Sequence, residues 1–144
     1  MRVADILKIK GSQVITIRPT DTIQAAAEKL LAEGVGALVA VSGTRALEGI
    51  ITERDISTGV AKFGRAVHDL TVAKLMTKAV VTCSIEDSIA AVSRIMTVRR
   101  MRHLPVTERD QLVGLVSIGD VLKSRLDEMQ LETSVLRDIA IASR

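Results

Sequence analysis

The 144-residue sequence has almost no aromatic residues, with no Trp, no Tyr and a single Phe, Phe63. Its core must therefore be built from aliphatic side chains and Met, and any base that it binds must be held by aliphatic walls. The formal net charge is only +3, and base stacking on aromatic side chains is excluded at all but one position. Both observations argue against a nucleic-acid partner.

Cysteine is nearly absent as well, since Cys83 is the single one. An intramolecular disulfide and a CxxC motif are thereby excluded, and a reducing cytoplasm is the expected compartment. Cys83 lies in a strand-like run and is expected to be a buried small residue rather than a nucleophile. The two histidines, His68 and His103, fall in no metal-binding spacing, so no metal site is predicted.

Long apolar runs and glycine-rich phosphate loops are also missing. The longest apolar run, Ala37 to Val41, is far shorter than the roughly 20 residues needed to cross a bilayer, and the N-terminus has no apolar signal core. Neither GxGxxG nor GxxxxGK[ST] occurs, so a Rossmann or P-loop enzyme is not supported. No acid–base pair or activated nucleophile points to catalysis.

The sequence does contain an internal duplication. GIITERD at Gly49 to Asp55 is followed 65 positions later by GLVSIGD at Gly114 to Asp120. Upstream, DTI at residues 21–23 matches DSI at 87–89, and VADIL at 3–7 matches VAKLM at 72–76. Each half reads as β-α-β-β-α, so we expect an α+β fold of two pseudo-symmetric repeats packed through their sheets.

The predicted boundaries follow from hydrophobic periodicity and turn residues. We expect repeats at 1–60 and 72–126, a linker at 61–71 and a helical extension at 127–144. In the first half we expect a strand at 14–17, a helix at 22–33 with Asp21 in its N-cap pair, and strands at 37–41 and 47–52 joined by a turn at 42–44. In the second half the corresponding strand lies at 80–83, the helix at 87–99, and the paired strands at 104–106 and 112–117.

The C-terminal segment from Gly119 to Ala142 predicts a helix that outruns the repeat. Its apolar residues near helical spacing are Leu122, Leu126, Met129, Leu136 and Ala140. This stripe can pack across its own domain or pair with another subunit, and both alternatives stay open.

The repeated motif has a chemistry of its own. Thr52 and Asp55 lie three residues apart at a strand end and the first turn of a helix, and Ser117 and Asp120 repeat the arrangement. A carboxylate suits the cis-diol of a ribose, while a hydroxyl and helix N-terminal amides suit a phosphate. The same residue types are also preferred helix N-caps, so a purely structural role is the alternative.

The two motifs, with MRHLPV at Met101 to Val106 before the second copy, resemble a tandem pair of cystathionine β-synthase (CBS) domains, the Bateman module, over residues 3–126. The resemblance implies that the hydroxyl residue and the aspartate contact the phosphate and ribose of an adenosine ligand. It also implies an adenine slot. In one cleft the implied residues, with the motif residues, are Ile50, Thr52, Asp55, Met76, Ala79, Val81, Met101 and Arg102. In the other they are Lys10, Gln13, Ile15, Val35, Gly36, Leu115, Ser117 and Asp120.

A basic cluster accompanies the first cleft, formed by Arg94, Arg99, Arg100, Arg102 and His103. It is either a solvated helix end or a phosphate site beside the cleft. Arg54 can serve similarly, whereas the second motif has Gly119 at that position, so we expect the two clefts to differ.

The function that the resemblance implies is regulatory binding of AMP, ADP, ATP, S-adenosylmethionine or NAD(H), without catalysis and with output to an effector protein. A structural oligomerisation module without ligand is the alternative. The helix faces and the C-terminal stripe further predict a homodimer.

Overall fold

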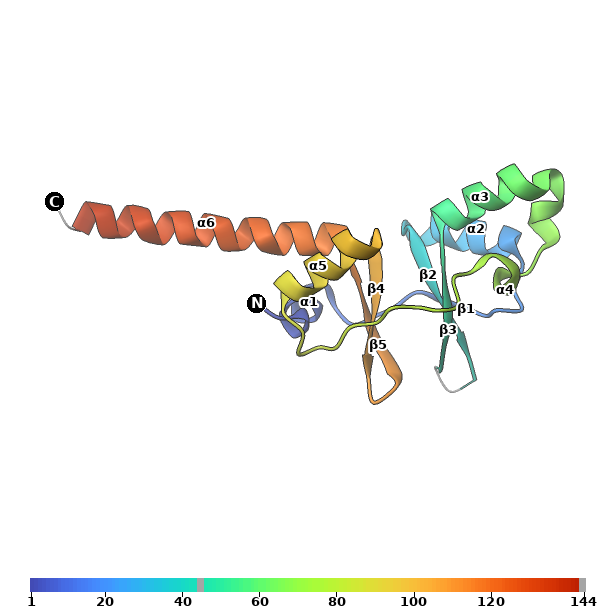
Figure 1. Cartoon of the computed structure of the whole chain (residues 1–144), viewed down its shortest axis with the longest axis horizontal. Helices are drawn as coiled ribbons and strands as arrows, with labels where there is room; N and C mark the ends of the chain where they lie inside the picture. Colours follow the sequence, from blue (N-terminus) through green and yellow to red (C-terminus); the bar gives the residue numbers. More distant parts are fainter. Residues whose placement is uncertain (44–45, 143–144) are drawn as a thin grey trace.

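The computed structural model describes residues 1–43 and 46–142 of the chain (Figure 1). Thr44, part of the turn expected at 42–44, lies outside the described residues. In chain order the elements are α1 (Val3–Lys10), β1 (Thr16–Ile17), α2 (Ile23–Glu33), β2 (Ala37–Ser42), β3 (Ala46–Thr52), α3 (Glu53–Phe63), the 3-10 helix η1 (Gly64–Asp69), α4 (Val72–Leu75), α5 (Ile89–Arg99), β4 (His103–Glu108), β5 (Gln111–Ser117) and α6 (Ile118–Ala142). The predicted α+β architecture with two halves is confirmed.

Each half contains an antiparallel pair of strands that ends in the repeated motif. β2 pairs with β3 so that Ala37 lies opposite Thr52, and β4 pairs with β5 so that His103 lies opposite Ser117. β1 adds a short parallel strand to β2. In the second half, the strand expected at 80–83 is reduced to one parallel bridge between Cys83 and Val106.

The helices α2 and α5 begin with hydroxyl caps. The Thr22 side chain accepts a hydrogen bond from the backbone N–H of Ala25, and the Ser88 side chain accepts one from Ala91. The expectation that Asp21 belongs to the cap of α2 is therefore wrong by one residue. Asp21 instead accepts a hydrogen bond from the backbone N–H of Arg18 and stabilises the turn before the helix.

The short helices that precede each half are exchanged between the halves. The α1 residues Val3 and Ile6 are buried in the core of the second half, whereas Val72 of α4 is buried in the core of the first half. Backbone hydrogen bonds fix the exchange, from Val3 to the carbonyl of Asp87 and from Val72 to the carbonyl of Asp21. The two halves are consequently interlocked, because each completes the core of the other.

The exchanged helices explain the glycine that opens each motif. A Cβ at Gly49 would lie 2.7 Å from the Met76 sulfur and 2.8 Å from the Thr77 carbonyl oxygen, and one at Gly114 would lie 2.8 Å from a methyl group of Leu7. At Gly49 a side chain would clash with the backbone of the exchanged segment, whereas at Gly114 it would require the Leu7 side chain to move.

The sheets meet through a third, smaller apolar cluster. Val14, Val39 and Leu112 are buried there, with Val41, Leu47 and Leu115 packed around them. The residues expected as a linker at 61–71 contain the end of α3 and all of η1, whose Val67 is buried in the first core. Figure 1 shows the chain after α4 crossing from the first sheet to the second.

The C-terminal helix α6 projects away from both halves (Figure 1). Its first turns are anchored, since Val121 and Ser124 are buried, but residues 129–142 are all exposed. The expectation that this helix can lie across its own domain is therefore wrong. Within residues 1–43 and 46–142, no helix is both long and apolar enough to cross a membrane.

Candidate functional site

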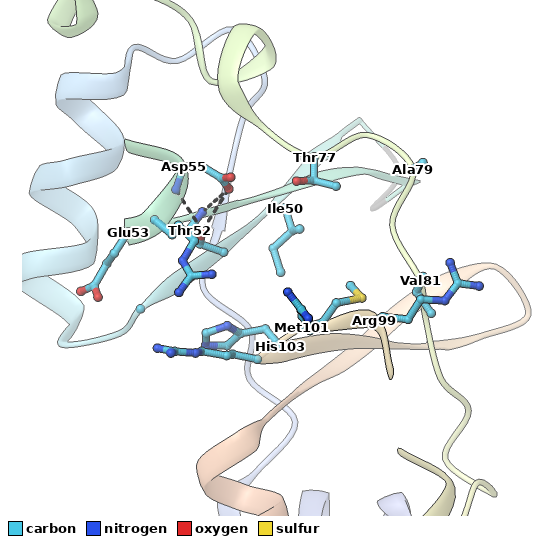
Figure 2. A pocket seen from close by; sticks show the side chains of 14 residues that line it. Ile50, Thr52, Glu53, Asp55, Thr77, Ala79, Val81, Arg99, Met101 and His103 are labelled. Carbon is cyan, nitrogen blue, oxygen red and sulfur yellow. Dashed lines mark hydrogen bonds between the residues drawn. The ribbon is translucent and has the colours of Figure 1, made fainter. Parts of the chain in front are cut away.

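A cavity of about 430 Å³ opens between the start of α3 and the start of β4 (Figure 2). Both halves contribute to it, because the first motif forms one side and the strand after α5 forms the other. It is lined by Gly36, Ile50, Thr52, Glu53, Arg54, Asp55, Thr77, Ala79, Val81, Arg99, Arg100, Met101, Arg102 and His103. A volume of this size is typical of small-ligand sites in proteins.

The structure brings together most of the residues expected in the first cleft. Of these the lining contains Ile50, Thr52, Arg54, Asp55, Ala79, Val81, Met101, Arg102 and His103. Met76 is the exception, because its side chain packs against Gly49 and the first core. Gly36, which was expected in the second cleft, lines this one.

The motif residues Thr52 and Asp55 form a reciprocal capping box at the start of α3. The Thr52 backbone N–H and hydroxyl donate to Asp55 Oδ2 at 2.9 and 3.0 Å, and the Asp55 N–H donates to Thr52 Oγ1 at 3.2 Å. Both bonds to the carboxylate use Oδ2. The capping role is thus real, and it holds Asp55 in a fixed position on the cavity wall.

Aliphatic side chains form the opposite part of the lining. Ile50 is only 5% exposed, and Figure 2 shows its side chain directed into the space between Asp55 and Met101. Ala79 and Val81 extend the apolar surface along the segment that connects the halves. The wall therefore offers flat, uncharged contacts of the kind that a base requires when aromatic residues are missing.

The rest of the rim is strongly basic. Four arginines line the cavity, Arg54, Arg99, Arg100 and Arg102. The same lining contains two carboxylates, those of Glu53 and Asp55. Guanidinium groups suit phosphate because their fork of N–H donors matches two phosphate oxygens. The charge balance of the lining favours an anionic ligand, and Figure 2 shows that Arg99 lies beside Val81, away from Thr52.

Arg100 holds its place on the rim in a conformation that favours glycine. It follows α5 with φ 54° and ψ 44°, whereas the residue that follows α2 in the first half is Gly34, with φ 64° and ψ 36°. A left-handed conformation is unfavourable for a residue with a Cβ atom. Arg100 is therefore strained at this position, and its side chain lies on the rim of the cavity.

His103 lies where the two halves meet. Its imidazole lies against Gly36, since a Cβ on Gly36 would be 3.8 Å from both Cε1 and Nε2, and Glu53 is equally close to that point. Burial lowers the pKa of His103, and the charge of Lys10 lowers it further, against the raising effect of Asp120 and Glu53. The ring is therefore neutral at pH 7, and its pKa depends on charged residues of both motifs.

Four further residues line the cavity although they were not among the expected ligand residues: Glu53, Thr77, Arg99 and Arg100. Arg99 and Arg100 belong to the basic cluster recognised in the sequence, and Glu53 is a variable position of the motif. The contribution of Thr77 could not be seen in the sequence, because it arises from backbone pairing. Its N–H donates to the carbonyl of Ile50 at 2.9 Å, and the Ile50 N–H donates to its carbonyl at 3.0 Å.

The second motif is arranged differently. The Ser117 N–H donates to Asp120 Oδ2 at 2.9 Å and the Asp120 N–H donates to Ser117 Oγ at 3.1 Å, as in the first half. Here, however, Lys10 Nζ also lies 2.7 Å from Asp120 Oδ2 and donates to the Leu115 carbonyl at 3.0 Å. The aspartate of this half is already paired with a cation of the same chain.

A cavity of about 140 Å³ lies beside Asp120 between α1 and α6, on a different face from the expected second cleft. It is lined by Met1, Ile6, Ile9, Lys10, Asp120, Lys123, Ser124 and Asp127. Only Lys10 and Asp120 of the expected second cleft are among these. Ile15 and Val35 pack against the first core, and Leu115 packs between the sheets.

Partial burial raises the pKa of Asp120, but hydrogen bonds from Lys10 and Ser117 outweigh this effect and hold the pKa below its usual range. Asp120 is therefore ionised at neutral pH.

The CBS-domain family profile matches residues 3–62 and 72–127. The mitochondrial CBS domain-containing protein CBSX3 of Arabidopsis thaliana is 33% identical over 138 residues, which cover 90% of this chain and 67% of the plant protein.

Solved structures agree in fold. The CBS-domain containing protein ATU1752 from Agrobacterium tumefaciens is 41% identical, with a TM-score of 0.85 over 87% of this chain and 99% of that protein. The CBS domain pair of protein MJ0100 is 27% identical, with a TM-score of 0.77 over 90% of this chain and 98% of its own, and its structure is a complex with 5-methylthioadenosine and S-adenosyl-L-methionine.

Proposed function

The chain belongs to the CBS-domain family, and on this basis we propose that it is a regulatory protein that binds a phosphorylated adenosine ligand in the cavity at Asp55. The ligand is AMP, ADP, ATP or NAD(H), and its binding is reported to an effector protein. One observation carries the proposal. A carboxylate fixed by a capping box, an aliphatic wall and four arginines line the same cavity.

Each part of the cavity matches one part of such a ligand. Ile50, Ala79, Val81 and Met101 provide the surface for the adenine ring. The Asp55 carboxylate accepts hydrogen bonds from the ribose hydroxyls through Oδ1, while Oδ2 receives those of Thr52. The Thr52 hydroxyl and the start of α3 face the phosphate.

The charge of the rim favours phosphate over a sulfonium ligand. S-adenosylmethionine has a net positive charge, because its sulfonium and ammonium groups outweigh its single carboxylate, whereas each phosphate adds negative charge that four arginines would attract. The lining of Arg54, Arg99, Arg100 and Arg102 therefore supports a nucleotide, although the related MJ0100 domain pair binds S-adenosyl-L-methionine and 5-methylthioadenosine.

We propose binding without chemistry at this site. Asp55 is engaged in the capping box, and the neutral His103 is packed against Gly36, so neither is arranged as part of an acid–base pair.

The buried Cys83, 5% exposed, supports a location in the reducing cytoplasm.

The test is a mass-spectrometric inventory of the small molecules released when the purified protein is denatured. The protein is expected to release an adenine nucleotide, and the Asp55→Ala variant, purified in parallel, is expected to release much less. Asp120→Ala is the matched control, because it removes the equivalent cap in the other half. Release of no adenosine compound, together with no binding of added AMP, ATP or NADH, would favour the alternative of a structural module without ligand.

We further propose that the chain forms a homodimer through α6. Four apolar residues of α6 follow the four-three spacing of a coiled-coil seam: Leu122, Leu126, Met129 and Leu136. Their side chains are 57%, 57%, 62% and 60% exposed, in that order. In a parallel pair, Glu132 of one chain would face Arg137 of the other across this seam. The exposed part, residues 129–142, extends roughly 21 Å, and a single helix of that length is only marginally stable in water.

Light scattering of two double variants tests the homodimer. Met129→Glu with Leu136→Glu places charges on the seam and should yield a monomer of 15.5 kDa. Leu131→Glu with Val135→Glu removes two apolar side chains, 67% and 48% exposed, from the other side of the helix and should leave the dimer intact. A wild-type mass of a monomer at micromolar concentration would reject the proposal.

A further inference from the structure

We propose that Lys10 weakens ligand binding in the second cleft by pairing with the aspartate that would otherwise bind ribose alone, so that the Asp55 cleft binds more tightly. The inference rests on the proposed function, because it takes Asp55 and Asp120 as equivalent ribose-binding groups. Lys10 thereby acts as a specificity-determining residue that makes two similar motifs unequal.

The difference begins in the exchanged helices. Leu7 and Met76 lie against Gly114 and Gly49 and mark equivalent points of the two halves. After this point the halves diverge, because α4 ends at Leu75 while α1 continues to Lys10. The additional turn of α1 brings the Lys10 ammonium to the second motif.

The Lys10 ammonium takes the place of a backbone donor in the first half. There, the carbonyl of Ile50 accepts a hydrogen bond from the Thr77 N–H at 2.9 Å. In the second half, the equivalent carbonyl of Leu115 accepts one from Lys10 Nζ at 3.0 Å. The same ammonium then reaches Asp120 at 2.7 Å, so it bridges the base-binding strand and the ribose-binding carboxylate.

Asp55 and Asp120 differ in the groups that donate hydrogen bonds to their carboxylates. The hydrogen bonds to the Asp55 carboxylate come from Thr52 of its own motif. Asp120 is held in addition by a cation from 110 positions away. Lys10 and the Ser117 N–H both bind Oδ2, so a ribose at Oδ1 would share the carboxylate with the ammonium.

The exposure of the Lys10–Asp120 pair sets the size of the expected change in ligand affinity. The Lys10 and Asp120 side chains are 36% and 22% exposed, so the bridge is partly screened by water and its removal is expected to change a binding constant about fivefold. The second cleft is therefore weakened by competition and not blocked.

The experiment measures adenosine binding in an Asp55→Ala background, where the first cleft is disabled and the second accounts for the binding that is left. Adenosine is neutral, so loss of a lysine charge does not by itself alter the attraction of the ligand. Adding Lys10→Ala should tighten binding about fivefold, and adding Asp120→Ala to that variant should abolish the gain. Lys8→Ala, on the same helix and also exposed, is the matched control and should change nothing.

Unchanged or weaker binding in the Lys10→Ala variant would overturn the inference, and weaker binding would make Lys10 a ligand contact instead. Lys10→Met keeps the aliphatic stem and provides the same comparison if the alanine variant fails to fold. NMR titration of Asp120 gives a reading without ligand, since its pKa should rise when Lys10 is replaced. The proposed function fails separately, if wild type and Asp55→Ala bind adenosine equally.

Discussion

Replacing Arg100 with glycine should stabilise the protein and weaken its binding of phosphate at the same time. Arg100 has φ 54° and ψ 44° after α5, a left-handed conformation that costs a residue with a side chain about 1 to 2 kcal/mol. Glycine relieves this strain but loses about 0.4 to 1 kcal/mol through its greater freedom in the unfolded chain. The free energy of unfolding should therefore rise by about 0.8 kcal/mol, the difference between the midpoints of these two ranges.

Urea unfolding and calorimetric titration with AMP and adenosine measure the two effects. Arg100→Gly should bind AMP severalfold more weakly because one guanidinium leaves the rim, and adenosine as tightly as wild type. Arg100→Ala should lose the same AMP affinity without the gain in stability. Arg99→Gly is the control for the backbone, because Arg99 is helical and the change should destabilise by about 1 kcal/mol. A variant Arg100→Gly that is no more stable than wild type, or that binds AMP equally well, would refute the reasoning.

Three further predictions concern packing and pH. Gly49→Ala should destabilise by about 1 to 3 kcal/mol in urea unfolding, because its Cβ would lie 2.8 Å from a backbone carbonyl. Because the pKa of His103 is lowered in the folded state, the unfolded chain takes up the proton more readily, so stability should fall as the pH drops below about 6.5. Urea unfolding at pH 8 and 5.5 should show this loss, and His103→Gln should reduce it. Burial, with the charge of Asp87, raises the pKa of Cys83 to about 12, so Ellman's reagent at pH 8 should modify it only after unfolding.

The Asp55 cavity could be predicted from the sequence to the extent that its residues belong to local motifs. Thr52, Asp55 and Ile50 occupy one short segment, and the capping box follows from hydroxyl and carboxylate at a spacing of three residues. Arg102 and His103 open the strand beside the second copy. Such placements need only the correct strand and helix order, which the repeat supplies.

The errors arise where the two halves are not copies. The resemblance assigned Met76 to the cavity and Gly36 to the other cleft, but Met76 packs against Gly49 and Gly36 lies against the His103 ring. The exchange of α1 and α4 was not predicted, since a repeat read along the chain assigns each short helix to the half that follows it. The pairing of Lys10 with Asp120 depends on both this exchange and the extra turn of α1.

The central claim is that Asp55 binds the ribose of an adenosine ligand, and the most direct test compares AMP with its 2′,3′-dideoxy analogue by calorimetry in two variants. Hydrogen bonds to a charged acceptor contribute about 1.5 to 3 kcal/mol each, so wild type should prefer AMP by at least about tenfold. Asp120→Ala, which loses the equivalent cap, should keep that preference, and Asp55→Ala should lose it. An equal preference for the diol in wild type and Asp55→Ala would contradict the account.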